Sequence, residues 1–253
     1  MAFSPTAGSR NLTVFLDAGH GGVDPGAVGT TESGQTIYEA DQTLSVELDA
    51  MAILRREGFE VVVSRTAATS VVRLGAGDVS AALLTIQGAH DDVAARDVCA
   101  NQAHANLLIG IYFDAGSSQT NGGAVTGYDG DRPFGADNLK LATLVQADVL
   151  AAMNAQGWGI PDEGVIPDGD LGSAISSRAM SYGHLLLLGP AEAGYFSTPS
   201  QMPGVLIEPL FITDPFEGSI AASSTGQQII ATGLAQAVEQ YFSLAATPKT
   251  TTG

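Results

Sequence analysis

The chain has 253 residues, of which 45% are hydrophobic, and its ten Lys and Arg residues against 27 acids give a formal net charge of -17. This size supports a sizeable core, and so acidic a surface repels phosphate backbones, which argues against nucleic acid as a partner. No apolar run approaches the roughly 20 residues of a membrane helix, so we expect no membrane span. The single cysteine, Cys99, excludes an internal disulfide and any cysteine-rich zinc site.

Segments typical of strands alternate with segments typical of helices. Short apolar runs that end in glycine or a polar residue predict strands at 12–19, 59–65, 107–113 and 204–208. Apolar residues at helical spacing predict helices at 39–57, 91–105, 138–156 and 226–242. The alternation predicts one α/β domain with a mostly parallel, twisted sheet flanked by helices.

Three parts of the chain are expected to differ from this pattern. Residues 67–88 have no clear period and are interpreted as an insertion or loop, and residues 157–202 are rich in Gly, Pro and Ser. We expect an N-terminal extension at 1–11, the α/β domain at 12–243 and a flexible tail at 244–253.

Functional sites in open α/β sheets gather at the carboxyl ends of strands. The polar residues expected at that edge are Asp17 and His20 after the first strand, Tyr112 and Asp114 after the third, and Glu208 at the end of the last. Glu39 opens the first long helix. A histidine and two glutamates that converge on one edge are typical of a zinc site with a separate general base.

Each of these residues also has a plainer explanation. A histidine among glycines is typical of a turn, and Glu39 suits the positive N-terminus of its helix. Glu208 is harder to explain structurally, because it directly follows Val-Leu-Ile and a carboxylate without a partner is costly to bury.

Five stretches occur along the chain in a fixed order: LDAGHGG around His20, YEADQTLSVEL around Glu39, GFEVVVSR at 58–65, RDVCAN at 96–101 and VLIEPLFITDP around Glu208. This order of motifs resembles the zinc-dependent N-acetylmuramoyl-L-alanine amidases of the type 3 amidase domain family. The resemblance runs from about Leu12 to Phe242 and keeps motif order throughout.

The resemblance implies an amidase/phosphorylase-hydrolase-like fold with zinc as cofactor. It places His20 and Glu39 on two zinc ligands and Glu208 on the catalytic glutamate that activates water. The implied reaction cleaves the amide between N-acetylmuramic acid and the L-alanine of the peptidoglycan stem peptide. Peptidoglycan or muropeptides are then the expected partners, with the cell envelope or the secreted fraction as the location, and we expect a monomer.

One position departs from the family pattern. The third zinc ligand of the family is a histidine at the end of the third strand, and the alignment places Tyr112 there. Tyr112 could bind as a phenolate, or Asp114 could replace it from the same strand face. His104 precedes the strand, so we reject it as a local substitute, and His184 is interpreted as a core or loop histidine.

Two classes of function therefore remain open. The first is an active amidase with an altered third ligand, and the second is a degenerate amidase homologue that acts as a peptidoglycan-binding or regulatory module. Retention of His20, Glu39 and Glu208 favours the enzyme.

Overall fold

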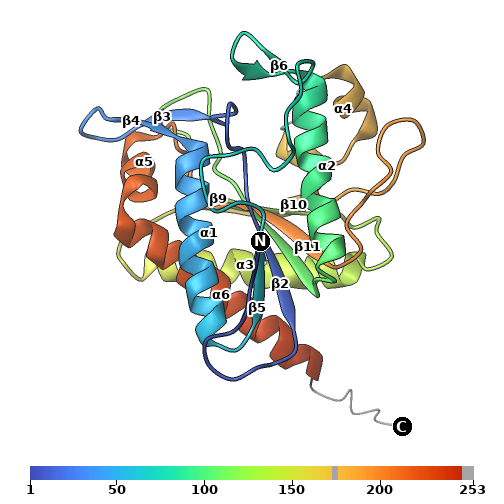
Figure 1. Cartoon of the computed structure of the whole chain (residues 1–253). Coiled ribbons are helices and arrows are strands. Elements are labelled where there is room, and N and C mark those ends of the chain that lie inside the picture. Colours follow the sequence, from blue (N-terminus) through green and yellow to red (C-terminus); the bar gives the residue numbers. More distant parts are fainter. Residues whose placement is uncertain (173–175, 247–253) are drawn as a thin grey trace.

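The centre of the fold is a seven-stranded sheet, seen in a computed structural model that describes residues 1–172 and 176–246 (Figure 1). In spatial order its strands are β1 (Ala2–Phe3), β5 (Glu60–Val63), β2 (Thr13–Ala18), β8 (Leu107–Ile111), β11 (Gly204–Glu208), β9 (Ala124–Tyr128) and β10 (Asp162–Pro167). Strands β5, β2, β8 and β11 are mutually parallel. Strands β9 and β10 are parallel to each other but antiparallel to β11, and β1 is antiparallel to β5.

Helices cover both faces of this sheet, as the unbroken apolar runs of its central strands require. On one face lie α1 (Glu39–Arg56), α3 (Gly135–Asn154), α5 (Pro215–Ala222) and α6 (Ser224–Ala246). The other face carries α2 (Ile86–Gln102), with the short α4 (Ser177–Tyr182) beyond it (Figure 1). Side chains of a strand alternate between the two cores: Val14 and Leu16 enter the larger one and Phe15 enters the smaller.

The predicted α/β class and the mostly parallel sheet are confirmed, and each predicted helix and strand is present, with shifted ends in all but β11. The largest shift is in α2, which begins at Ile86 rather than residue 91. Its start is set by Thr85, whose Oγ1 accepts a hydrogen bond from the backbone N–H of Gly88 at 3.0 Å, a side-chain cap that supports an earlier first turn.

Several short elements were not predicted. They are β1 in the expected N-terminal extension, the hairpins β3–β4 (Val28–Thr30 and Thr36–Tyr38) and β6–β7 (Val79–Ser80 and Leu83–Leu84), strands β9 and β10, α4, α5 and the 3-10 turn η1 (Asp168–Leu171). The hairpin β6–β7 lies in the segment interpreted as a loop. Helix α6 continues through Ala246, and the rest of the expected tail, 247–253, lies outside the described residues.

No helix in the described part of the chain is both long and apolar enough to cross a membrane.

Candidate metal and catalytic site

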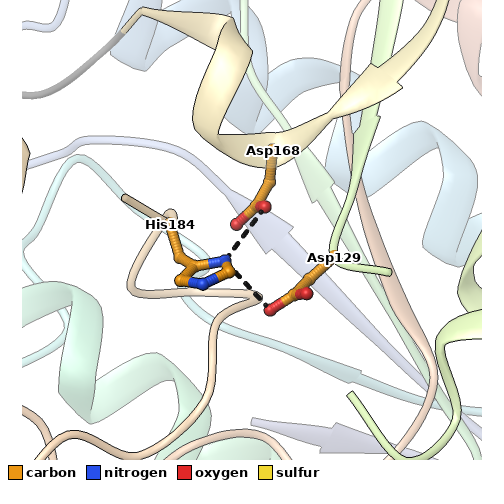
Figure 2. Close-up of side chains that lie close together, drawn as sticks. All are labelled: Asp129, Asp168 and His184. Atoms are coloured by element: carbon orange, nitrogen blue, oxygen red, sulfur yellow. Dashed lines mark hydrogen bonds and ion pairs between the residues drawn. The ribbon is translucent and has the colours of Figure 1, made fainter. Parts of the chain in front are cut away.

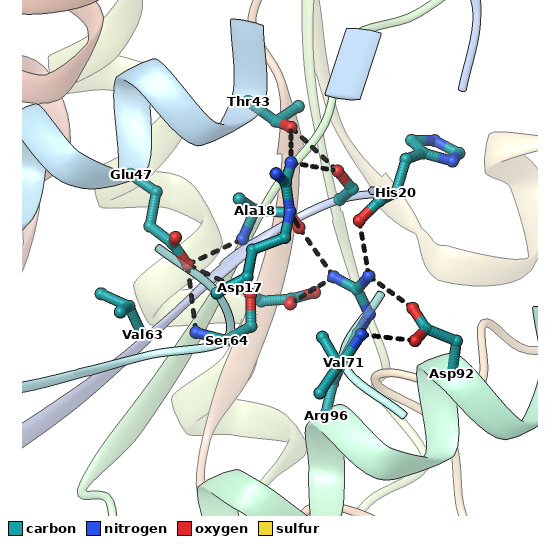
Figure 3. Close-up of polar contacts among 12 residues, drawn as sticks. Asp17, Ala18, His20, Thr43, Glu47, Val63, Ser64, Val71, Asp92 and Arg96 are labelled. Atoms are coloured by element: carbon teal, nitrogen blue, oxygen red, sulfur yellow. Dashed lines mark hydrogen bonds and ion pairs between the residues drawn. The ribbon is translucent and has the colours of Figure 1, made fainter. Parts of the chain in front are cut away.

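The turn after β2 has a backbone shape that two buried arginines hold in place (Figure 3). His20 has φ +61°, a left-handed conformation that a non-glycine residue adopts only at a cost. Arg96 of α2 donates to the carbonyls of Ala18 at 2.7 Å and His20 at 2.8 Å. Arg65, just after β5, donates to the carbonyl of Gly19 at 3.0 Å. These bonds fix the direction in which the His20 side chain leaves the sheet.

Arg96 also joins two buried carboxylates into one network. Its guanidinium lies 2.6 Å from Asp17 Oδ1 and 2.7 Å from Asp92 Oδ2, and its side chain is 1% exposed. Removing one member of such a buried group leaves an uncompensated charge, at a cost of about 3–5 kcal/mol. Asp17, expected at this edge of the sheet, is therefore a support of the turn, and its side chain is fully buried.

Two glycines make room for the side chains of the site. A Cβ at Gly19 would lie 2.5 Å from the ring of Tyr112, and a Cβ at Gly26 would lie 2.6 Å from both Glu39 Oε2 and the His20 ring. Real Cβ atoms do not approach this closely. The small residues around His20 thus allow the imidazole, the carboxylate and the aromatic ring to pack together.

His20 lies between two carboxylates that contact opposite nitrogens of its ring. Nε2 is 3.1 Å from Glu39 Oε2, and Nδ1 is 2.8 Å from Asp24 Oδ2. A carboxylate on one nitrogen orients the ring and raises the basicity of the other nitrogen, as it commonly does for metal-binding histidines. Asp24 was not predicted, although it stands four residues after His20, just past the family stretch LDAGHGG, in the turn GGVDPG.

The backbone holds Glu39 in position. Its Oε1 accepts a hydrogen bond from Phe113 N at 2.9 Å and its Oε2 accepts one from Ala27 N at 2.8 Å. Burial lowers the pKa of His20, but Glu39 and then Asp24 outweigh burial and raise it to about 10. The carboxylates therefore create a strong preference for positive charge at His20, which a proton or a metal ion can satisfy.

Glu208 ends β11 and lines the same cavity as His20 and Glu39. The residue is 8% exposed, and its buried Oε2 accepts no hydrogen bond from the described residues. Burial, with Asp114 and Glu39, raises the pKa of Glu208 to about 8, against a smaller lowering by His20. A carboxyl group with a pKa near neutrality and an unpartnered oxygen is suited to accept and return a proton.

The two candidates for a third ligand differ in where their oxygens lie. The Tyr112 ring packs edge-on against His20, with ring centroids 5.4 Å apart, and its hydroxyl donates to Asp17 Oδ2 at 3.3 Å. Burial, together with Asp17, raises the pKa of the Tyr112 phenol well above its ordinary value. Asp114 lines the cavity and its Oδ1 accepts from Ala115 N at 2.6 Å.

His20 Nε2 and Glu39 Oε2 are placed to be two of the ligands of one divalent metal ion. Tetrahedral zinc ligands at about 2.0–2.2 Å from the ion lie about 3.4 Å apart, close to the separation of His20 Nε2 and Glu39 Oε2. Tyr112 fits less well, because its oxygen is directed toward Asp17 and the phenolate is disfavoured there.

A cavity of about 1500 Å³ extends from this site across the face of the sheet. Its lining includes His20, Glu39, Asp114 and Glu208, and further along Leu171, Asp168 and His184. Its volume is sufficient for a bulky substrate rather than a small ion alone.

The other histidines have separate surroundings. His104 lies in the turn between α2 and β8, with φ +50°. His90 Nε2 lies 3.0 Å from the carbonyl of Tyr195. His184 lies between Asp129 and Asp168 (Figure 2). None of the three belongs to the group around His20.

Several known proteins with similar sequences are N-acetylmuramoyl-L-alanine amidases by name. The germination-specific N-acetylmuramoyl-L-alanine amidase of Bacillus subtilis is 25% identical over 90% of this chain and 79% of its own length. The N-acetylmuramoyl-L-alanine amidase AmiA of Salmonella typhimurium is 27% identical over 93% of this chain and 77% of its own length.

The fold is shared with solved structures. The CwlD amidase from Clostridioides difficile, solved in complex with the GerS lipoprotein, superposes with a TM-score of 0.69 at 21% identity, over 92% of this chain and all of that chain. The family model for N-acetylmuramoyl-L-alanine amidase matches residues 14–240. This chain belongs to the N-acetylmuramoyl-L-alanine amidase family of type 3 amidase domains.

Proposed function

We propose that this protein is a peptidoglycan hydrolase that cleaves the amide bond between N-acetylmuramic acid and the L-alanine of the stem peptide. The observation that carries the proposal is the juxtaposition of three groups in one cavity. His20 Nε2 and Glu39 Oε2 lie 3.1 Å apart, and Glu208 Oε2 is buried without a hydrogen bond from the described residues.

His20 and Glu39 would hold a zinc ion. When bound, zinc supplies a Lewis acid that polarises the scissile carbonyl and lowers the pKa of water toward about 7. Asp24 orients the His20 ring by its contact with Nδ1. The backbone bonds to both oxygens of Glu39 keep that carboxylate in place.

Glu208 would be the general base and then the general acid. It takes a proton from the attacking water as the new C–O bond forms, and returns it to the leaving nitrogen as the amide C–N bond breaks. The products are a muramyl carboxylate and a stem peptide with a free L-alanine amino group. The raised pKa of Glu208, about 8, favours the second transfer, because its acid form is stable near neutral pH.

For the third ligand we propose Asp114 ahead of Tyr112. Asp114 follows β8 and lines the cavity, and burial with Glu39 raises the pKa of its carboxyl group despite the bond from Ala115 N. Tyr112 would have to give up its bond to Asp17 before its oxygen could bind a metal. Asp114 would bind as a carboxylate without breaking that network, after its side chain moves closer, because its ligand atoms and those of His20 and Glu39 do not all lie within 4.8 Å of one another.

The remaining parts of the proposal follow from the substrate. Peptidoglycan or muropeptides would occupy the large cavity, and the protein would act in the cell envelope or after secretion, as a monomer. A degenerate homologue that only binds wall fragments is the competing function, and the altered third ligand position favours it.

Digestion of purified muropeptides separates the two functions. Zinc-loaded protein should release stem peptides with free L-alanine amino groups, and chelator-treated protein should release none until zinc is restored. If loaded protein retains no zinc and releases no stem peptide but still sediments with peptidoglycan, the binding module is correct and the amidase proposal fails.

A further inference from the structure

A second group of metal-binding residue types lies where two other strands end. Asp129 directly follows β9, Asp168 opens η1 directly after β10, and His184 follows α4. Strands β9 and β10 are parallel neighbours with Tyr128 opposite Pro167, so the two aspartates meet at one edge of the sheet. One possible ligand atom from each of the three residues lies within 4.8 Å of the other two.

The distances within this group match a metal site better than a hydrogen-bonded one. His184 Nδ1 lies 3.3 Å from Asp129 Oδ2 and 3.4 Å from Asp168 Oδ1 (Figure 2). Hydrogen bonds of this type are usually about 2.7–3.2 Å long. Two ligand atoms of a tetrahedral zinc ion are about 3.4 Å apart.

Backbone contacts aim both carboxylates at the same point. Asp129 Oδ1 accepts from Asp131 N at 2.7 Å, and Asp168 Oδ2 accepts from Leu185 N at 2.8 Å. The other oxygen of each aspartate is directed at His184 (Figure 2). Such bonds fix the orientation of ligating carboxylates in known metal sites.

The burial of Asp129 gives a second observation that favours a cation at this position, since the nearest group to its Oδ2 is the His184 ring at 3.3 Å. The residue is 1% exposed, and its Oδ2 accepts no hydrogen bond within the part of the chain that the structure covers. A buried carboxylate oxygen without a donor is costly unless a cation compensates it. A hollow of about 480 Å³ beside the group, lined also by Asp131 and Asp170, gives a cation a negatively charged way in.

We propose that Asp129, Asp168 and His184 bind a zinc-class divalent ion, separate from the ion proposed at His20 and Glu39. An imidazole with two carboxylates suits zinc and similar first-row ions. Calcium and magnesium prefer oxygen ligands alone, so His184 disfavours them.

This site is distinct from the first one in space. Glu208 pairs with Val125, and Asp129 lies four residues after Val125, directly past the end of β9. At about 3.3 Å per residue, Val125 and Asp129 are therefore about 13 Å apart along the chain. The ion would join the ends of β9 and β10 to the segment that follows α4, and two of its three ligands, Asp168 and His184, line the substrate cavity.

The role of the ion is structural, because it cross-links three segments that are distant in the sequence. Binding to the folded state alone stabilises a protein in proportion to the logarithm of ion concentration over Kd. Zinc should therefore raise the Tm of the protein through this site even when the first site is disabled.

The test is a calorimetric titration of zinc chloride into the His20→Asn variant, which removes the first site and makes the result independent of the proposed amidase function. We expect the titration to give about one zinc ion per chain, and we expect thermal unfolding of the same variant to show a higher Tm with zinc than without it. Adding His184→Gln or Asp129→Asn should weaken zinc binding at least tenfold and abolish the rise in Tm. Circular dichroism would establish that each variant is folded, and Glu39→Gln is an alternative background.

Asp131→Asn is the matched control, because Asp131 lines the same hollow but lies outside the three-residue group. It should leave zinc stoichiometry and affinity unchanged. If the His20→Asn protein binds no zinc, or binds it equally well with His184→Gln, the proposal is wrong and the three residues form only an ion-paired network.

Discussion

The two histidine–carboxylate groups of this protein contain the same residue types in different arrangements. At the first, carboxylates contact opposite nitrogens of His20, with Asp24 on Nδ1 and Glu39 beside Nε2. At the second, Asp129 and Asp168 are both directed at a single nitrogen of His184. The first arrangement presents an oriented nitrogen to the cavity, whereas the second encloses one point from three sides.

This difference in arrangement distinguishes a site suited to catalysis from a site suited only to binding an ion. Beside the first group stands Glu208, a carboxyl group with a pKa of about 8 and an unpartnered oxygen, which can move protons. In the second group both aspartates are committed as ligands of the same ion. Catalysis requires an additional acid–base group that does not bind the ion, and Glu208 is such a group in the cavity that His20 and Glu39 line.

Among the variants that test this difference between the two sites, Glu208→Gln has the largest expected effect, a loss of hydrolysis. Hydrolysis of muropeptides should fall about 10²–10⁴-fold, because an amide cannot accept the proton. Zinc content, measured by elemental analysis, should not change. Glu163→Gln, at an exposed position of β10, is the control and should retain full activity. Unchanged hydrolysis by Glu208→Gln would remove this residue from the mechanism.

Asp24→Asn tests whether zinc binding at the first site depends on the orientation of the His20 ring by Asp24. Replacing a carboxylate that supports a metal-binding histidine typically weakens metal affinity about 10–100-fold, and we expect that loss in a chelator competition assay. Asp41→Asn, exposed in the first turn of α1, is the matched control. Equal zinc affinity in both variants would show that Asp24 has no such role.

The third ligand of the first site is assigned by comparing Asp114→Asn with Tyr112→Phe. We expect Asp114→Asn to weaken zinc binding about tenfold, or about 1.4 kcal/mol. Tyr112→Phe should have a smaller effect, since its hydroxyl is engaged with Asp17. The reverse order in a zinc titration would identify Tyr112 as the ligand. Tyr112→His should strengthen binding in either case.

The smallest expected effect is a change with pH in the stability of the metal-free protein, caused by buried carboxyl groups with raised pKa values. Burial, with Asp17, raises the pKa of Glu47 to about 8, and burial with Asp114 and Glu39 does the same for Glu208. Their unfolded pKa values are near 4.5, so between about pH 4.5 and 8 the folded state binds more protons and stability falls as pH rises.

Thermal unfolding of metal-free protein at pH 6 and pH 8 measures this effect. The Tm should be lower at pH 8, and Glu208→Gln should reduce the difference. His20 acts in the same direction at higher pH, since its raised pKa of about 10 stabilises the fold below pH 6.5 and that contribution disappears as pH rises through 10. A Tm that rises from pH 6 to pH 8 would contradict these assignments.

The sequence indicated that His20, Glu39 and Glu208 lie near one another, but it gave no indication of the group Asp129, Asp168 and His184. Unbroken apolar runs identify β2, β8 and β11, and His20 and Glu208 follow from where those runs end. Asp24 was missed because its contact depends on the left-handed backbone at His20, which Arg96 holds from a distant helix.

The second group was missed because its strands were missed. β10 is a half-exposed edge strand within a Gly-, Pro- and Ser-rich segment, and β9 contains Gly127 and follows a Gly- and Asn-rich loop. Neither has the apolar run or the strict alternation that indicates a strand. Without these strands, nothing in the sequence places His184 beside Asp129 and Asp168.

The most direct test of the central claim is mass spectrometry of muropeptides digested by the zinc-loaded protein. The account predicts two products, a lactyl carboxylate on N-acetylmuramic acid and a stem peptide with a free L-alanine amino group, and neither with Glu208→Gln. Intact muropeptides, or cleavage at a different bond, would contradict it.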